Sequence, residues 1–162
     1  MSKKWIAILV LGTFLLCLGL VGCGQQQTTS SQKKVIKIGS ETTFPPFEFQ
    51  DEKTHEYIGF DIDLAKAVFK QAGYESEIVS LNFDGLIPAL EAQTIDAIIS
   101  GMQITDERSK KVLFSNPYYD SGQGILVKLD NTTINSWKDL EGKRIGVQIG
   151  TTGAMEAKKV PN

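Results

Sequence analysis

Apolar and polar positions alternate along residues 35–128 in segments that predict strands and helices in turn. Strands are predicted at residues 35–39, 75–81, 95–100 and 123–128. Helices are predicted at residues 61–72, 83–93 and 106–111, and the first of them places Leu64, Ala65, Val68 and Ala72 on one face. Residues 40–49 predict a loop that contains two prolines in a row, which exclude a central strand there, and residues 50–56 predict a turn between short extended pieces. Strands that alternate with helices predict an α/β fold with a mainly parallel sheet.

The pattern restarts after a polar, linker-like stretch at residues 131–135. A one- or two-turn helix is predicted at residues 136–140, a strand at 144–148, and a further helix that opens at 150–153. In parallel sheets ligands bind beyond the carboxyl ends of the strands. The loops after Gly39, around Phe83 and after Ser100 are therefore the candidate ligand loops.

The N-terminal segment has a different pattern. Lys3 and Lys4 precede an uncharged, mostly apolar stretch at residues 5–22, which is the layout of a secretory signal, although its length also allows a membrane-spanning helix. Residues 20–23 resemble the lipobox of bacterial lipoproteins, so we expect cleavage before Cys23 and attachment of a lipid to its thiol; an uncleaved anchor is the alternative. Residues 1–22 are then the signal peptide, and 23–34 the lipidated Cys and a flexible tether without apolar residues. These features predict export and anchoring to the outer face of the cell membrane, as in Gram-positive lipoproteins.

Composition narrows the classes of function. The chain has 162 residues, of which 41% are hydrophobic, too many for intrinsic disorder. The formal net charge is −2, and it becomes −4 without residues 1–22, which argues against a nucleic-acid partner. One His and two Cys exclude a zinc site built from those residues, and we predict no metal and no cofactor.

Six segments then point to a family. They are residues 39–49, 59–64, 83–90, 100–108, 114–119 and 146–153. In this order they resemble the bacterial extracellular solute-binding proteins of family 3, and residues 86–108 resemble the glutamine-binding branch most. The resemblance implies a two-lobe, type II periplasmic-binding-protein fold. It also implies the substrate-binding component of an ABC importer, with a polar, glutamine-like amino acid as ligand, the permease subunits as partner and no enzymatic activity.

The resemblance also divides the chain. It implies that residues 35–128 are most of lobe 1 and that residues 129–162 begin lobe 2, with a hinge in the crossover near residues 120–128. Because members of the family are longer, it implies a chain truncated at its C-terminus, without the return segment to lobe 1. We expect such a fragment to bind ligand weakly or not at all.

The sequence contains candidate partners for the carboxylate and for the ammonium group of an amino-acid ligand. Arg108 follows a strand and a glycine turn, and its planar guanidinium suits a carboxylate, which is also the role of the family's Arg at this place. Thr151 and Thr152 lie at a helix start after Gly150, where free N–H groups favour an anion. Glu41 is the candidate partner of the ligand's ammonium group, although the family more often has Asp there.

Other candidates rest mainly on the resemblance. Phe44 and Phe83 resemble the family's aromatic walls, and such rings also attract cations. The resemblance implies that Ser100, Gly101 and Gln103 border the ligand and that Gln148 reads its side chain. Asp61 and Asp63 are interpreted as structural residues that cap and orient the first helix.

Three alternatives stay open. The same fold serves as the sensor domain of membrane receptors, and a few relatives are cleft enzymes such as dehydratases, for which Glu41 is the one catalytic candidate. The third alternative is a fragment without function.

Overall fold

The structure is a computed structural model that describes residues 34–161. The predicted signal peptide, Cys23 and the tether up to residue 33 lie outside the described residues. Within residues 34–161, no helix is both long and apolar enough to cross a membrane.

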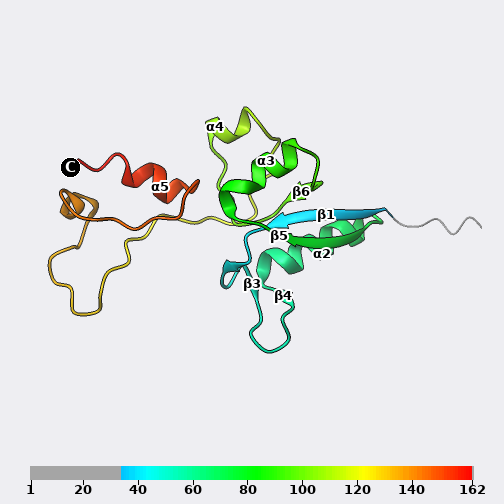
Figure 1. The fold of residues 1–162 in the computed structure, drawn as a ribbon, viewed down its shortest axis with the longest axis horizontal. Helices are drawn as coiled ribbons and strands as arrows, with labels where there is room; N and C mark the ends of the chain where they lie inside the picture. The colour runs from blue at the N-terminus through cyan, green and yellow to red at the C-terminus, as the bar shows by residue number, and fades with distance from the viewer. Residues whose placement is uncertain (1–33, 162) are drawn as a thin grey trace, which may run out of the picture. The chain divides into compact units, whose positions relative to one another are not determined.

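A three-stranded parallel sheet forms the centre of the described fold (Figure 1). Its strands β1 (Val35–Ser40), β5 (Glu75–Ser80) and β6 (Ala97–Ile98) lie in the order β5-β1-β6. Ile38 is opposite Ile78 on one side and Ala97 on the other, and all pairs are parallel, which confirms the predicted parallel sheet. Because the chain crosses from one side of β1 to the other, β1 is the point where the strand order reverses, and ligands bind at such points.

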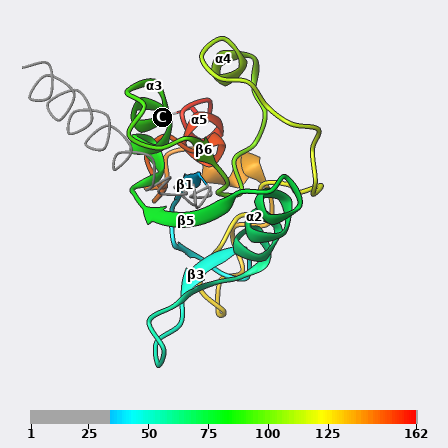
Figure 2. The ribbon, with the colours of Figure 1, turned by 90° about the vertical axis from the view of Figure 1, so that its right-hand side faces the viewer.

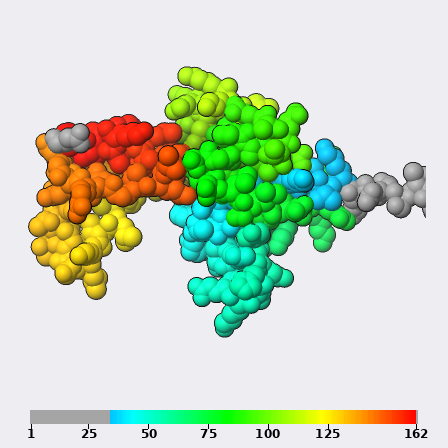
Figure 3. All heavy atoms as spheres, in the orientation of Figure 1, coloured from blue at the N-terminus to red at the C-terminus, as the bar shows by residue number. Residues whose placement is uncertain are grey.

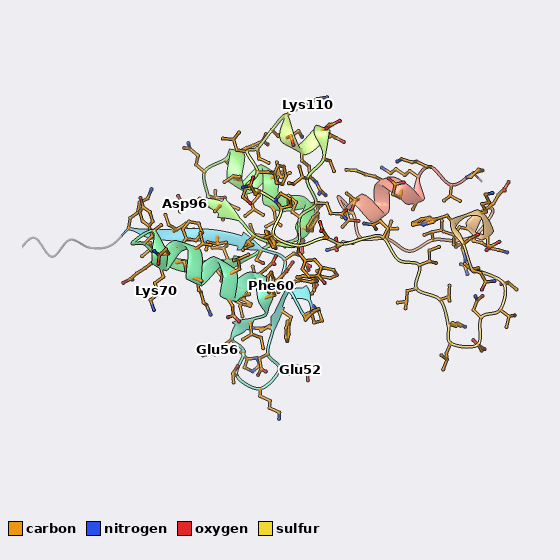
Figure 4. All side chains as sticks on the ribbon, turned by 180° about the vertical axis from the view of Figure 1, so that it is seen from behind. Glu52, Glu56, Phe60, Lys70, Asp96 and Lys110 are labelled. Atoms are coloured by element: carbon orange, nitrogen blue, oxygen red, sulfur yellow. The ribbon has the colours of Figure 1, made fainter. Side chains whose placement is uncertain are left out.

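Two helices connect these strands. Helix α2 (Phe60–Gln71) leads from β1 to β5, and the turn η1 (Phe83–Gly85) with helix α3 (Leu86–Glu91) leads from β5 to β6 (Figures 1 and 2). Both helices were predicted from their apolar spacing. Phe60 and Lys70 mark the two ends of α2 in Figure 4.

The apolar core lies between the sheet and these helices. Ile36, Ile38 and Ala65 form a buried cluster against which Phe69 packs. The predicted inward face of the first helix is wrong in part, because α2 buries Ile62 and Ala65, whereas Val68 is 52% exposed. Ala65 and Phe69, four residues apart on the helix, pack on the sheet, and Ile62 is also buried.

A small antiparallel sheet stands where a loop with extended pieces was predicted. It consists of β2 (Thr43–Phe44), β3 (Glu48–Gln50) and β4 (Tyr57–Ile58), in that order. The two prolines lie between β2 and β3, outside any strand, as expected for residues that cannot complete a ladder. The turn between β3 and β4 projects from the surface (Figure 3), and Glu52 and Glu56 lie on it (Figure 4).

Regular structure becomes sparse after β6. The short helices α4 (Asp106–Ser109), η2 (Trp137–Leu140) and α5 (Thr152–Ala157) occur where helices were predicted. The predicted strands at residues 123–128 and 144–148 are wrong, because neither segment is paired with another strand in the described part of the chain. A single unpaired strand leaves its backbone groups without partners, so an apolar pattern alone does not form one.

Candidate functional site

One cleft of about 940 Å³ gathers the candidate residues. The three loops that follow β1, β5 and β6 supply Glu41, Phe83 and Ser100 at the same edge of the sheet. All ten predicted residues line this cleft: Glu41, Phe44, Phe83, Ser100, Gly101, Gln103, Arg108, Gln148, Thr151 and Thr152. That they bind a ligand stays a prediction.

The side chain of Arg108 is fixed by hydrogen bonds and by an aromatic ring. Helix α4 begins after Thr105, whose hydroxyl accepts a hydrogen bond from the Arg108 N–H at 3.2 Å. The guanidinium donates to the carbonyl of Gln103 at 2.6 Å and to that of Gly150 at 2.9 Å. It also lies over the Phe83 ring, 5.3 Å from the centroid.

The Arg108 guanidinium is buried and keeps its positive charge. Arg108 is only 5% exposed, and burial lowers its pKa, yet a guanidinium stays charged in proteins. Two carbonyls occupy two of its five N–H groups, and Arg108 is among the residues that line the cleft.

Acidic and aromatic groups form part of the cleft's wall. The Glu41 N–H donates to the Ser100 hydroxyl at 2.9 Å, and the Thr43 hydroxyl donates to the Glu41 carboxylate. The Phe44 ring is 52% exposed and stacks on Phe47 with centroids 5.6 Å apart. This wall presents a carboxylate and an aromatic face, a combination that suits a cation.

Gly101 forms the turn that connects these groups. Its φ is +51°, which favours glycine, and a Cβ there would lie 3.5 Å from the Phe44 ring. Its N–H donates to a carboxylate oxygen of Asp61 at 2.7 Å, and this oxygen also accepts from the Tyr118 hydroxyl at 2.8 Å. The predicted capping by Asp61 is wrong, because α2 begins after Gly59 without a side-chain cap, but Asp61 and Asp63 do lie in its first turn, where acids favour the helix dipole. Asp61 instead holds the turn at the cleft.

Sequence reasoning missed Glu48. This residue on β3 is 1% exposed, lines the cleft and accepts a hydrogen bond from the Ser100 hydroxyl at 3.1 Å. Burial, and next the charge of Asp61, raise the pKa of Glu48 to about 8. Burial and the contact with Asp61 also raise the pKa of Tyr118. The only signal in the sequence is an acid between two phenylalanines, Phe47 and Phe49.

A cluster of amides lies farther along the cleft. The Thr152 hydroxyl donates to the Gln103 side-chain oxygen, and the Gln123 amide donates to the same oxygen at 3.2 Å and to the Thr152 hydroxyl at 3.0 Å. Gln123 lines the cleft and was placed by sequence reasoning in a strand. The Thr151 hydroxyl caps α5, accepting from the Ala154 N–H and donating to the Gln148 carbonyl, so it is already used within the helix start.

The comparisons identify the family. The bacterial extracellular solute-binding proteins, family 3, match residues 36–159. The chain belongs to this family, and its fold is that of the type II periplasmic binding proteins, as the resemblance implied.

Among similar proteins, the arginine-binding extracellular protein ArtP of Bacillus subtilis (strain 168) is 39% identical over 158 residues, which are 98% of this chain and 60% of ArtP. An ancestral arginine-binding protein solved with arginine is 51% identical, with a TM-score of 0.76 over 78% of this chain and 55% of that one. The ancestral protein solved with glutamine gives the same identity and TM-score, over 78% of this chain and 56% of that one. The chain thus spans a little over half the length of these proteins.

Proposed function

We propose that the protein is the substrate-binding component of an ABC importer and that it captures a polar amino acid in the cleft described above. The family and the names of the similar proteins support an amino-acid ligand. The observation that carries the proposal is the buried Arg108 guanidinium, held by two carbonyls with N–H groups left for an anion.

The cleft offers a partner for each part of an amino acid. The ligand's carboxylate binds Arg108, and its ammonium group binds Glu41 with the Ser100–Gly101 turn. Phe44 and Phe83 enclose the aliphatic part, and the amides of Gln103 and Gln148 face the polar end of the side chain, with Thr151 and Thr152 beside them.

The ligand is in the first place arginine rather than the glutamine expected from residues 86–108. Similar proteins are named for arginine, and the ancestral protein was solved with either ligand. The side-chain oxygen of Gln148 suits both, because a guanidinium and an amide each donate N–H groups, whereas that of Gln103 already accepts from Thr152 and Gln123. A negative charge at Glu41 and the aromatic face of Phe44 favour the cationic ligand.

Closure and anchoring complete the proposal. The segment near residues 120–128 acts as the hinge, contacts from both predicted lobes stabilise the closed state, and the permease subunits recognise that state. The exported protein is held at the outer face of the membrane by a lipid on Cys23. No catalytic step is proposed, because the role of the cleft is capture.

Calorimetric titration of the full-length gene product with L-arginine, L-glutamine and L-histidine tests the proposal. We expect arginine to bind most tightly, and Arg108→Ala to lower its affinity about 100-fold or more, because the variant leaves a buried carboxylate without its partner. Arg144→Ala is the control, since Arg144 is exposed and outside the cleft. Unchanged affinity in Arg108→Ala contradicts the site, and the absence of binding by all three amino acids contradicts the function.

A further inference from the structure

Two carboxyl groups are buried together beneath the candidate site. Glu48 on β3 is 1% exposed, and Asp61 in the first turn of α2 is fully buried. The single ion pair among the described residues joins Lys159 to Glu156, so no cation neutralises either acid there. Two unpaired charges side by side in a protein interior are strongly unfavourable, and such groups take up a proton instead.

The hydrogen bonds leave one oxygen of each carboxyl group without a donor. One oxygen of Asp61 accepts from the Gly101 N–H and the Tyr118 hydroxyl, and one oxygen of Glu48 accepts from the Ser100 hydroxyl. The second oxygen of each carboxyl group has no donor within residues 34–161. Ser100 and Gly101, which hold the two side chains, are consecutive residues, and the Asp61 N–H donates to the carbonyl of Phe47, next to Glu48, at 2.8 Å. The two carboxyl groups are therefore neighbours, and a proton between their second oxygens gives each of them a partner.

Every charged or titratable group that acts on Glu48 favours its protonated form. Asp61 from α2 and Glu41 from the segment after β1 are both acidic, and burial acts in the same direction. Only the hydrogen bond from Ser100 lowers the pKa of Glu48, which is raised to about 8. Tyr118, from the segment after α4, contacts Asp61 as a neutral donor.

The acid pair is linked directly to the groups proposed to bind the ligand. Ser100 donates to Glu48 and accepts from the Glu41 N–H, while Gly101 donates to Asp61. Glu48 also lines the cleft. Only Ser100 separates Glu41 from Glu48 in this series of hydrogen bonds. A positive charge that enters the cleft beside Glu41 is therefore near Glu48, and a nearby cation favours the ionised form of an acid.

We propose that Glu48 and Asp61 are positioning residues that share one proton beneath the amino-acid site, and that the site releases this proton when the ammonium group of a ligand binds. The O–H bond of Glu48 breaks, its electron pair stays on the carboxylate, and the proton passes to the solvent. The ligand's positive charge takes the place of the proton's charge. The proton sharing stands independently, whereas its release on binding rests on the function proposed above.

The proton sharing is tested without ligand. Carbon-13 NMR of the full-length gene product, with labelled glutamate carboxyl groups, gives the titration of each Glu, and Glu48→Gln assigns the signal. We expect Glu48 to titrate near 8 and Asp61→Asn to move its midpoint downward, because Asn removes the neighbouring charge. Glu52→Gln is the control, as Glu52 lies exposed on the turn between β3 and β4 (Figure 4). If Asp61→Asn fails to fold, the wild-type titration decides alone, and a midpoint in the ordinary carboxyl range overturns the proposal.

The release is tested by calorimetry with L-arginine in buffers of different ionisation enthalpy at pH 7. The expected result is the release of up to one proton per ligand, with affinity falling by up to about tenfold for each pH unit below 8. Glu48→Gln should bind without releasing a proton, whereas Glu52→Gln should behave as the wild type. Binding without proton release by the wild type overturns the release. If no amino acid binds, the proposed function and the release fail together, while the NMR titration still decides the proton sharing.

Discussion

Two regions of the molecule have similar apolar patterns and different structures. Region 1, residues 35–109, contains all the strands and most of the buried apolar side chains of the described chain. Region 2, residues 110–161, contains η2 and α5, and only Leu140 and Ala154 are buried apolar residues there. Its Leu126 is fully exposed, although it lies in a segment as apolar as the strands of region 1.

The difference shows that an apolar pattern needs neighbours to become a strand. β1 is paired on both sides, so its backbone groups find partners, and its Ile36 and Ile38 are buried against Ala65 of α2. Residues 123–128 have no strand beside them in the described chain. The two regions nevertheless meet at Arg108, whose guanidinium donates to the carbonyl of Gly150.

A matched pair of leucines should give the largest contrast. Leu86 is fully buried against the sheet, so Leu86→Ala should lower the free energy of unfolding by about 2–5 kcal/mol. Leu126→Ala removes the same atoms from an exposed position and should change it by less than about 0.5 kcal/mol. Urea denaturation of both variants measures the contrast, and equal losses would show that region 2 is packed as tightly as region 1.

The acid pair of region 1, Glu48 and Asp61, should make the stability of the protein vary with pH. The pKa of Glu48 is raised in the folded state from the ordinary 4.5 to about 8, so the folded state binds its proton more strongly than the unfolded state. The stabilisation of the folded state that this raised pKa provides is fully present below about pH 4.5 and is lost as the pH rises to 8. We expect the free energy of unfolding to fall by about 1–2 kcal/mol across this window, after allowance for solvent screening.

Glu48→Gln keeps the shape and remains neutral at every pH, so it should remove most of this fall. Urea denaturation at several pH values is the measurement. A wild-type stability that rises over the same window, or a variant with an unchanged profile, would contradict the account.

The two threonine caps offer a smaller contrast. Thr105 accepts from the Arg108 N–H at the start of α4, and Thr151 accepts from the Ala154 N–H at the start of α5. Thr105→Ala should cost about 1 kcal/mol, because the helix it caps belongs to region 1 and carries the buried Arg108. Thr151→Ala should cost less in global unfolding, since region 2, to which α5 belongs, has only Leu140 and Ala154 as buried apolar residues. Thermal denaturation compares them, and a greater loss in Thr151→Ala would reverse the assignment of stability to region 1.

Local patterns predicted the main elements of region 1. The residues of β1, α2 and β5 have clear periodicity, and the alternation of strands and helices led to the parallel sheet. The loops after these strands led to Arg108 and Glu41, and the resemblance to the family led to most of the other predicted residues; all ten are among the residues that line the cleft. The same reasoning placed strands in region 2, because periodicity does not reveal whether a segment has a strand beside it.

The acid pair of Glu48 and Asp61 was not predicted from the sequence, for a related reason. Glu48 is buried by contacts with Asp61 and with Ser100, which lies 52 residues later. Only its position between Phe47 and Phe49 distinguishes Glu48 from a surface acid in the sequence. Gln123 was missed likewise, because its partners Gln103 and Thr152 come from distant segments.

Hydrogen exchange of the full-length gene product, with and without saturating L-arginine, tests most directly whether both regions build one amino-acid site. We expect amides around residues 41–48, 100–108 and 148–154 to gain protection together, although region 2 exchanges faster than region 1 without ligand. Protection confined to region 1, or no change at saturation, would contradict this expectation.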